Sequence, residues 1–267
     1  MEGVNGSSQV RLRRSKIAAG TRLAVSVRSQ RMTRNMLKII ACVSMLVDHI
    51  GFILMPEVAY LRYIGRLALP IFAFFIGEGC LYTRNRKKYF IRIFSLAVFC
   101  QLFYIGEYLF TKSSNPFYLN ILFTFSASVL LCSSLIASTE ERAQGIKGKS
   151  DFVLGALVIF FFVLCKLNEE GIIPVEFDYG FGGIILPVFA AVSKDRKKKL
   201  LSFAFGLALV ILFKNYRDPM WTVCALSAII PLCLYNGRSG KYNLQKAFYL
   251  FYPAHLGALY LISAIVK

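Results

Sequence analysis

Residues 37–55 read LKIIACVSMLVDHIGFILM, an apolar stretch long enough to cross a membrane as a helix. Its only acidic or basic side chains are Lys38, Asp48 and His49, and His49 is one of two histidines in 267 residues. Charged side chains inside a bilayer cost about 2.5–3.5 kcal/mol each on insertion scales, so they indicate a functional site by default. The stretch therefore predicts a membrane-spanning helix that carries part of a site.

The composition of the whole chain is typical of a membrane protein. Hydrophobic residues make up 57% of it and charged residues 17%, whereas a soluble domain carries roughly 25% charged residues. Long apolar runs alternate with short charged loops, and the two-residue alternation of a membrane β-barrel is absent. We therefore predict an all-α fold, a polytopic, multi-pass helical bundle in a cell membrane.

The apolar runs predict about nine transmembrane helices in a single domain over residues 36–267. The expected spans are 36–55, 67–83, 89–110, 118–137, 151–166, 180–193, 199–214, 220–235 and 247–266. The sixth and seventh are short, and glycines and Pro187 interrupt the sixth. One of these two is expected to be re-entrant or broken.

The net charge of +18 admits two interpretations, a nucleic-acid partner or a topology signal. With nine alternating spans and a cytoplasmic N-terminus, 25 of the 32 Lys and Arg residues fall in the N-terminal segment and the inner loops. This asymmetry favours the topology signal, and we expect no nucleic-acid partner. The TRNRKK run at 83–88 is expected to face the cytoplasm, where it can also contact anionic lipid.

Residues 1–35 are rich in Arg and Ser and lack an apolar core, which is not the pattern of a secretory signal peptide. We expect a disordered basic arm, or alternatively an extension upstream of a true start at Met32 or Met36. The seven cysteines are isolated in apolar runs without metal-binding spacing. They are predicted to be small core residues, and no metal site is expected.

Lys38 and His49 are eleven residues apart, just over three helical turns, so they share one helix face about 16 Å apart. A ligand entering from the cytoplasm could be held by its phosphate end at Lys38 and react near His49. The alternatives are a snorkelling lysine and a hydrogen-bonded packing histidine. Asp48 points about 100° away from His49, so it is expected to pair with a cation on a neighbouring helix, Arg62 or Arg66.

Further polar residues interrupt later apolar segments. Glu78 lies in the inner half of the second span and should be partnered or protonated, as part of a site or as a structural hydrogen bond. Asp178 and Tyr179 precede the sixth span and fit either a substrate-facing lid or a surface loop. His255 follows Pro253 in the last span, where it is either a pocket member or structural.

Three motifs resemble a known family. LKIIACVSMLVDHIGF (37–52), LRYIGRLALPIFAFFIGEG (61–79) and TRNRKKYFIRI (83–93) resemble the N-terminal half of the TraX family, membrane pilin acetylases of conjugative plasmids. DYGFGG (178–183) and NILFTFSASVLL (120–131) look like later segments of that family, and FYLFYPAHL (248–256) looks like the last span of the wider membrane acyltransferase superfamily. The resemblance covers most of residues 36–267.

The resemblance implies an activity and a site. The superfamily uses a basic residue and a histidine with ten residues between them in its first span, which Lys38 and His49 match. It implies that His49 is the catalytic base and that acetyl-coenzyme A is the donor substrate, with no bound cofactor. Arg66 or Tyr179 is then the candidate donor to the oxyanion. The superfamily usually has about ten spans, whereas this chain is predicted to have nine.

Three hypotheses for function follow. The first is an acetyltransferase that modifies an amine or hydroxyl of a membrane-presented or extracytoplasmic acceptor, a pilin-like peptide or a cell-surface glycan. The second is a small transporter with a proton relay through Asp48, His49 and Glu78; it predicts an internal repeat, which the sequence lacks. The third is an assembly factor whose site is vestigial, in which case His49 would tolerate substitution.

Overall fold

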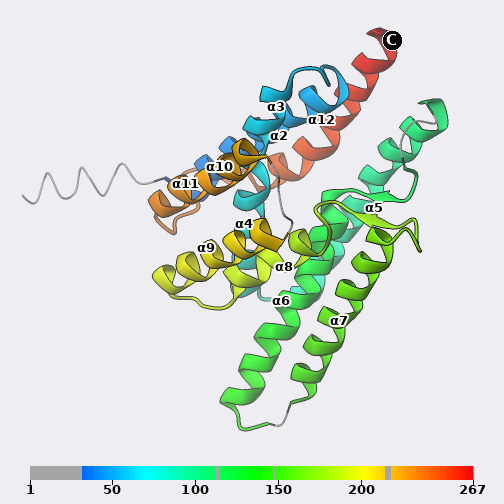
Figure 1. Ribbon diagram of the computed structural model, residues 1–267. Coiled ribbons are helices and arrows are strands. Elements are labelled where there is room, and N and C mark those ends of the chain that lie inside the picture. The colour runs from blue at the N-terminus through cyan, green and yellow to red at the C-terminus, as the bar shows by residue number, and fades with distance from the viewer. Residues whose placement is uncertain (1–31, 112–114, 147, 214–217, 267) are drawn as a thin grey trace, which may run out of the picture.

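The computed structural model describes residues 32–111, 115–146, 148–213 and 218–266, and these are almost entirely helical (Figure 1). The predicted basic arm over 1–35 lies outside them except for its last four residues. There the backbone of Met32 pairs with the 234–236 segment, and the first described helix, α2 (Arg34–Ile53), begins two residues before the predicted span. The Thr33 side chain caps α2 by accepting a hydrogen bond from the amide of Met36.

The second predicted span, 67–83, is α4 (Ala68–Tyr82). A short helix that the sequence did not predict, α3 (Ala59–Gly65), precedes it and is joined to it by a tight turn. Pro70 lies in the first turn of α4, where its missing amide hydrogen costs no helical bond. This break places Arg66 at the turn rather than inside a continuous helix.

The middle of the chain forms three long helices and a short pair of strands. α5 (Arg86–Thr111) is followed by β1 (Tyr118–Leu119), α6 (Ile121–Ala143), α7 (Lys149–Glu169) and β2 (Glu176–Phe177). β1 and β2 pair in parallel, Tyr118 with Glu176 and Leu119 with Phe177. The pairing fixes the segment that leads into Asp178 and Tyr179 against the start of α6.

The C-terminal part of the chain consists of shorter helices and one long one. These are α8 (Gly180–Ala191), α9 (Arg196–Phe213), α10 (Pro219–Ser227), α11 (Ile229–Leu234) and α12 (Gln245–Val266). In Figure 1, α12 lies beside α2 at one edge of the molecule, and the α6–α7 hairpin extends away from them.

Each of the nine predicted spans is helical in the structure, but within the described residues six helical segments are long and apolar enough to cross a membrane. They are Arg34–Ile53, Ala59–Tyr82, Arg86–Leu109, Ile121–Ala143, Lys149–Glu169 and Gln245–Val266. The other three predicted spans are α8, which has 12 residues, α9, which starts with four cations, and the α10–α11 pair, which is broken at Ala228. Together with large apolar side chains that stay exposed, such as Phe152, Leu201 and Ile265, these helices identify a membrane-embedded protein.

Ion pairs mark one end of the bundle, called the basic end here. Glu78 near the end of α4 binds Arg34 at the start of α2 and Lys199 in the first turn of α9. Arg86 at the start of α5 binds Glu140 near the end of α6. The basic loops that follow α4 and α8 therefore lie at the same end of the molecule as the start of α2.

A second set of polar contacts marks the opposite end, called the site end. Asp48 near the end of α2 binds Arg62 and Arg66 around the α3–α4 turn. The Tyr63 hydroxyl donates to Asp218, the N-cap of α10, at 2.6 Å. That hydrogen bond lowers the pKa of Asp218. Successive helical segments thus run in alternate directions between the two ends.

Candidate active site

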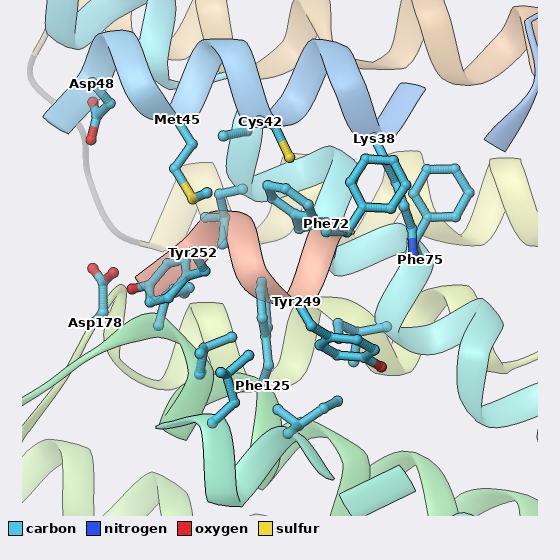
Figure 2. A pocket seen from close by; sticks show the side chains of 18 of the residues that line it. Lys38, Cys42, Met45, Asp48, Phe72, Phe75, Phe125, Asp178, Tyr249 and Tyr252 are labelled. Atoms are coloured by element: carbon cyan, nitrogen blue, oxygen red, sulfur yellow. The ribbon is translucent and has the colours of Figure 1, made fainter. Parts of the chain in front are cut away.

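A cavity of about 150 Å³ lies between α2, α4, α5, α6 and α12; it is called the central cavity here (Figure 2). Most of its wall is apolar and aromatic, including Phe72, Phe75 and Phe125. Five residues that the sequence singled out also line it: Lys38, Asp48, His49, Asp178 and Tyr179. The structure therefore gathers residues from α2 and from the segment before α8 around one space.

Lys38 and His49 both line the central cavity, as their shared helix face predicts. The Lys38 ammonium lies 5.6 Å from the ring centre of Phe75 and 5.4 Å from that of Phe248, distances at which a cation is attracted to the ring face. Figure 2 shows Lys38 and Asp48 at opposite ends of the cavity-lining part of α2. The cavity is thus long in the direction of the helix axis.

Lys38 also lines a larger pocket of about 600 Å³ at the basic end, called the basic pocket here. Its wall includes three further cationic side chains, Arg34, Arg92 and Lys241. The two spaces share part of their walls. The shared residues are Lys38, Phe75, Tyr89, Gln245, Phe248 and Tyr249. The pair forms an electropositive entrance followed by an apolar interior.

Asp48 is held by two arginines, as the helix geometry predicts. Its Oδ2 accepts from Arg62 at 2.7 Å and its Oδ1 from Arg66 at 2.5 Å. The carboxylate lies directly against Gly65, where an added Cβ would come within 2.1 Å of Oδ1. A glycine at 65 is therefore required for this approach of α2 to the α3–α4 turn. The described hydrogen bonds of Asp48 go to the arginines and not to His49.

Arg66 is buried, with 4% of its surface exposed, and its nitrogens are distributed among neighbours. It donates to Asp48, to the Arg62 carbonyl at 2.8 Å and to the Tyr179 hydroxyl at 2.8 Å. Its guanidinium also lies 4.3 Å from the ring centre of Trp221. Arg66 is absent from the described lining of the central cavity. Of the two predicted oxyanion donors, Tyr179 reaches the cavity and Arg66 supports it from behind.

The 178–180 segment has an uncommon backbone. Tyr179 has φ of +61°, a left-handed conformation that a residue with a Cβ adopts at a cost of about 1–2 kcal/mol. The Thr124 hydroxyl donates to the Asp178 carbonyl at 2.9 Å, and Gly183 packs against the same backbone. This arrangement turns the chain into α8 and orients Tyr179 toward Arg66, so the segment is part of the site rather than a surface loop.

His49 contacts the second histidine of the chain. Its Nδ1 lies 2.7 Å from Nε2 of His255 on α12, and Nδ1 of His255 lies 2.7 Å from the Phe251 carbonyl oxygen. The two imidazole planes are 4° apart with centroids 5.0 Å apart. The short nitrogen–nitrogen distance means that the rings meet edge to edge in nearly one plane. His255 is absent from the described cavity lining, so it lies behind His49 rather than beside a ligand.

Glu78 lies at the basic end, away from the residues around His49. Its oxygens accept from Lys199 at 3.0 Å, Arg34 at 3.2 Å and the Tyr235 hydroxyl at 3.1 Å. It lines the basic pocket and is absent from the described wall of the central cavity. Glu78 is therefore partnered, as predicted, and the structure does not bring it together with Asp48 and His49.

Several site residues were not found from the sequence. Tyr252 lines the central cavity and contacts both imidazoles edge-on, with centroids 6.4 Å from His49 and 5.5 Å from His255. Trp221, the single tryptophan, covers Arg66. Lys199, the first residue of the predicted span 199–214, was not singled out from the sequence, yet it is buried against Glu78. Its place at the start of an apolar run was the available signal.

These features define a membrane-embedded helical protein with a cavity between α2, α4, α5, α6 and α12, whose mostly apolar wall carries Lys38, Asp48 and His49. The chain belongs to the TraX family, because the family profile described as "TraX protein" matches residues 33–263. It is 28% identical over 243 residues to a "Probable fimbrial assembly protein FimC, serogroup H1" of Dichelobacter nodosus, covering 84% of this chain and 92% of that protein. It is also 32% identical over 103 residues to an uncharacterized protein of Rickettsia prowazekii (strain Madrid E), covering 33% of this chain and 41% of that protein. No solved structure matches.

Proposed function

We propose that this chain is a membrane acyltransferase. It transfers an acetyl group from acetyl-coenzyme A to an amine or hydroxyl of an acceptor in the membrane or on its outer side. The observation that supports this most is the placement of Lys38 and His49 on the wall of one cavity, with Lys38 also on the wall of the basic pocket. A histidine on the wall of an apolar cavity, away from the basic pocket, can act as a base where water is scarce.

The shapes and charges of the two spaces suit an acyl-coenzyme A. The phosphates of that molecule match the cations Arg34, Lys38, Arg92 and Lys241 of the basic pocket. Its long, mostly neutral arm matches the aromatic wall of the central cavity. The thioester at the tip of the arm would then lie near His49, about 16 Å along α2 from Lys38.

The reaction needs one base and one hydrogen-bond donor. His49, neutral, takes the proton of the acceptor amine or hydroxyl as that group attacks the thioester carbonyl carbon. The Tyr179 hydroxyl, which accepts a hydrogen bond from Arg66, donates to the developing oxyanion. The new C–N or C–O bond forms, the C–S bond breaks, and His49 passes the acceptor's proton to the coenzyme A thiolate, which leaves as the thiol. Asp48 acts by holding Arg66.

The relatives suggest a role connected with pili. One is named as a probable fimbrial assembly protein, so a pilin-like peptide is the first acceptor to test, with a cell-surface glycan as the second. We also propose nine crossings of the cell membrane with a cytoplasmic N-terminus. This topology is supported by the alternating directions of the helical segments and by the basic loops gathered at one end.

The first test uses the full-length protein in nanodiscs with radiolabelled acetyl-coenzyme A and envelope extracts. Wild type should bind the donor and produce a labelled acceptor. His49→Gln should bind with unchanged affinity and lose transfer by about 10²- to 10⁴-fold, the usual contribution of a general base. Lys38→Met should instead weaken binding. Wild type that neither binds the donor nor labels any component would reject the proposal and favour transport assays.

A further inference from the structure

The contact between the only two histidines of the chain determines where their protons lie. A backbone carbonyl can only accept a hydrogen bond. The Phe251 carbonyl lies 2.7 Å from Nδ1 of His255, so this nitrogen carries a proton. In a neutral His255, Nε2 is then the acceptor. The 2.7 Å contact with His49 therefore requires a proton on Nδ1 of His49.

With both rings neutral, this is the only assignment that satisfies both hydrogen bonds. It leaves the lone pair of His49 on Nε2, the ring nitrogen that takes no hydrogen bond from the described part of the chain. His49 lines the central cavity and His255 lies behind it. The basic nitrogen is therefore the one left for a ligand.

We propose that His255 is a positioning residue that holds His49 in the Nδ1–H tautomer, so that Nε2 is the base. The inference rests on the proposed acetyl transfer for its catalytic meaning, although the tautomer itself does not depend on it. The role matches that of the carboxylate in a Ser–His–Asp triad, which also fixes the imidazole through Nδ1. Here the orienting group is a neutral ring anchored by its own helix backbone.

A neutral partner suits this location. A carboxylate behind His49 would place another charge inside the bundle, where each ion costs several kcal/mol before it is paired. Asp48, the carboxylate next to His49 in the sequence, is bound by Arg62 and Arg66 instead. When His49 takes a proton during the reaction, the hydrogen bond from its Nδ1 becomes charge-assisted and stronger. His255 thus supports the imidazolium without adding a charge of its own.

Nitrogen NMR tests the tautomer directly, because ¹⁵N-histidine labelling of the full-length protein gives only four ring nitrogens. Wild type in nanodiscs should show a proton on Nδ1 of both rings and a coupling between Nδ1 of His49 and Nε2 of His255. In His255→Phe, which keeps an aromatic ring beside Phe251 and Tyr252, His49 should revert to the Nε2–H tautomer that a neutral histidine side chain prefers in water. A proton on Nε2 of His49 in wild type would overturn the proposal.

Kinetics test the positioning role. His255→Phe should lower kcat by about 10- to 100-fold with an unchanged KM for acetyl-coenzyme A, a loss within the contribution of a general base. His255→Gln places an amide oxygen as acceptor and should recover most of the rate. The matched control is Tyr260→Phe on the same helix, which loses the hydrogen bond to Glu107 and should keep wild-type kcat.

The outcomes separate the two proposals. If wild type shows the coupling between the two rings but His255→Phe keeps wild-type kcat, the positioning role is overturned. Coupled rings in a wild-type protein that transfers no acetyl group would reject the proposed function and support the tautomer assignment. If kcat falls equally in His255→Phe and His255→Gln, without loss of thermal stability, a hydrogen-bond acceptor at position 255 is not sufficient for the rate. That result also overturns the positioning role.

Discussion

The charged side chains at the site end form a closed set at the level of single residues. Asp48 has two arginine partners, and Arg66 divides its donors among a carboxylate, a carbonyl and a phenol. Asp48, Arg62 and Arg66 are thus paired by hydrogen bonds and ion pairs. None of the three is an isolated charge in the bundle, where an unpaired charge would be most costly. Arg62, with 35% of its side chain exposed, is the only one of the three ionised groups that reaches toward solvent or lipid headgroups.

Removing Arg66 should therefore be damaging. Arg66→Met leaves the Asp48 carboxylate, 14% exposed, with only the more exposed arginine, and we expect a loss of about 3–5 kcal/mol, as for other broken buried pairs. Thermal unfolding in detergent measures it. Adding Asp48→Asn to Arg66→Met should recover part of the loss, because the unpaired charge is then removed.

The control for Arg66→Met is Arg142→Met, which breaks an ion pair with Asp151 at the surface. Its arginine is 71% exposed, and we expect no measurable change in Tm. Equal effects of the two substitutions would contradict the view that burial makes the Asp48–Arg66 pair important.

Tyr179 should matter to the chemical step more than to binding. Tyr179 lines the central cavity, and Tyr179→Phe removes its hydroxyl, which accepts a hydrogen bond from Arg66 at 2.8 Å. If it donates to the oxyanion, kcat should fall by about 10²- to 10³-fold with little change in KM. Steady-state kinetics with acetyl-coenzyme A measures this. Tyr63→Phe, which loses its bond to Asp218 outside the cavity, should retain wild-type rates, and a comparable loss there would assign both effects to packing.

At the residue scale, the sequence predicted those side-chain placements that depend on the geometry of a single helix. Helical geometry placed Lys38 and His49 on one face and directed Asp48 to Arg62 or Arg66, and the structure agrees on each placement. The His49–His255 contact joins residues 206 positions apart. No periodicity within either segment specifies which faces of α2 and α12 meet, so this contact required the tertiary structure.

At the scale of elements, close approach between helices depends on glycines. Gly65 lets the α3–α4 turn pack on Asp48, and Gly77 lets α4 approach α8, where an added Cβ would lie 2.1 Å from the Pro187 carbonyl oxygen. Gly65 thus contacts the Asp48 side chain, and Gly77 contacts the backbone of α8. These contacts set how closely α2 approaches the α3–α4 turn and how closely α4 approaches α8.

Gly65→Ala should destabilise the protein and disturb the site together. The new methyl group would overlap the Asp48 carboxylate, so Asp48 must leave at least one arginine, at a cost of about 1–3 kcal/mol for overpacking alone. Gly155→Ala in α7 is the matched substitution, because nothing lies within 4 Å of its Cβ position. There a gain of about 0.5–1 kcal/mol is expected from the helix preference of alanine. Thermal unfolding that ranks the two in the opposite order would contradict the packing argument.

All nine predicted apolar segments became helices, but their lengths were predicted less well. Hydrophobicity finds apolar runs, whereas helix ends depend on caps and on tertiary contacts. The predicted start of the second span at residue 67 agrees with the start of α4, but α3 before it was not predicted. The break at Ala228 divides one predicted span into α10 and α11. The break at Ala228 lies inside a continuous apolar run, so hydrophobicity alone does not locate it.

At the scale of the whole molecule, different ion pairs distinguish the two ends of the helical bundle. The basic end holds the Glu78 ion pairs and the basic pocket, and the site end holds Asp48 and its arginines. The central cavity extends between them along α2. A ligand whose anionic groups bind the cations of the basic pocket would therefore enter from the basic end. In the proposed topology, the positive-inside rule places that end in the cytoplasm.

Cysteine labelling tests this orientation. In a background with Ser at the two cysteines that are not buried, Cys224 and Cys233, single cysteines at Glu57 and Glu170 should react with a membrane-impermeant maleimide in intact cells. Single cysteines at Asn85 and Asp195 should react only after the membrane is opened. Labelling of Asn85→Cys in intact cells would overturn the nine-crossing topology with a cytoplasmic N-terminus.

The short helix α8 has a consequence for how the protein is made. Its 12 residues extend about 18 Å, less than the roughly 30 Å hydrocarbon layer, yet half of them are buried. Such a segment gains little by partitioning into lipid alone during synthesis at the translocon. It needs α4 and α6, against which it packs, and both are synthesised before it. Biogenesis of the site should therefore require that α4 and α6 are already inserted in the membrane when α8 leaves the ribosome.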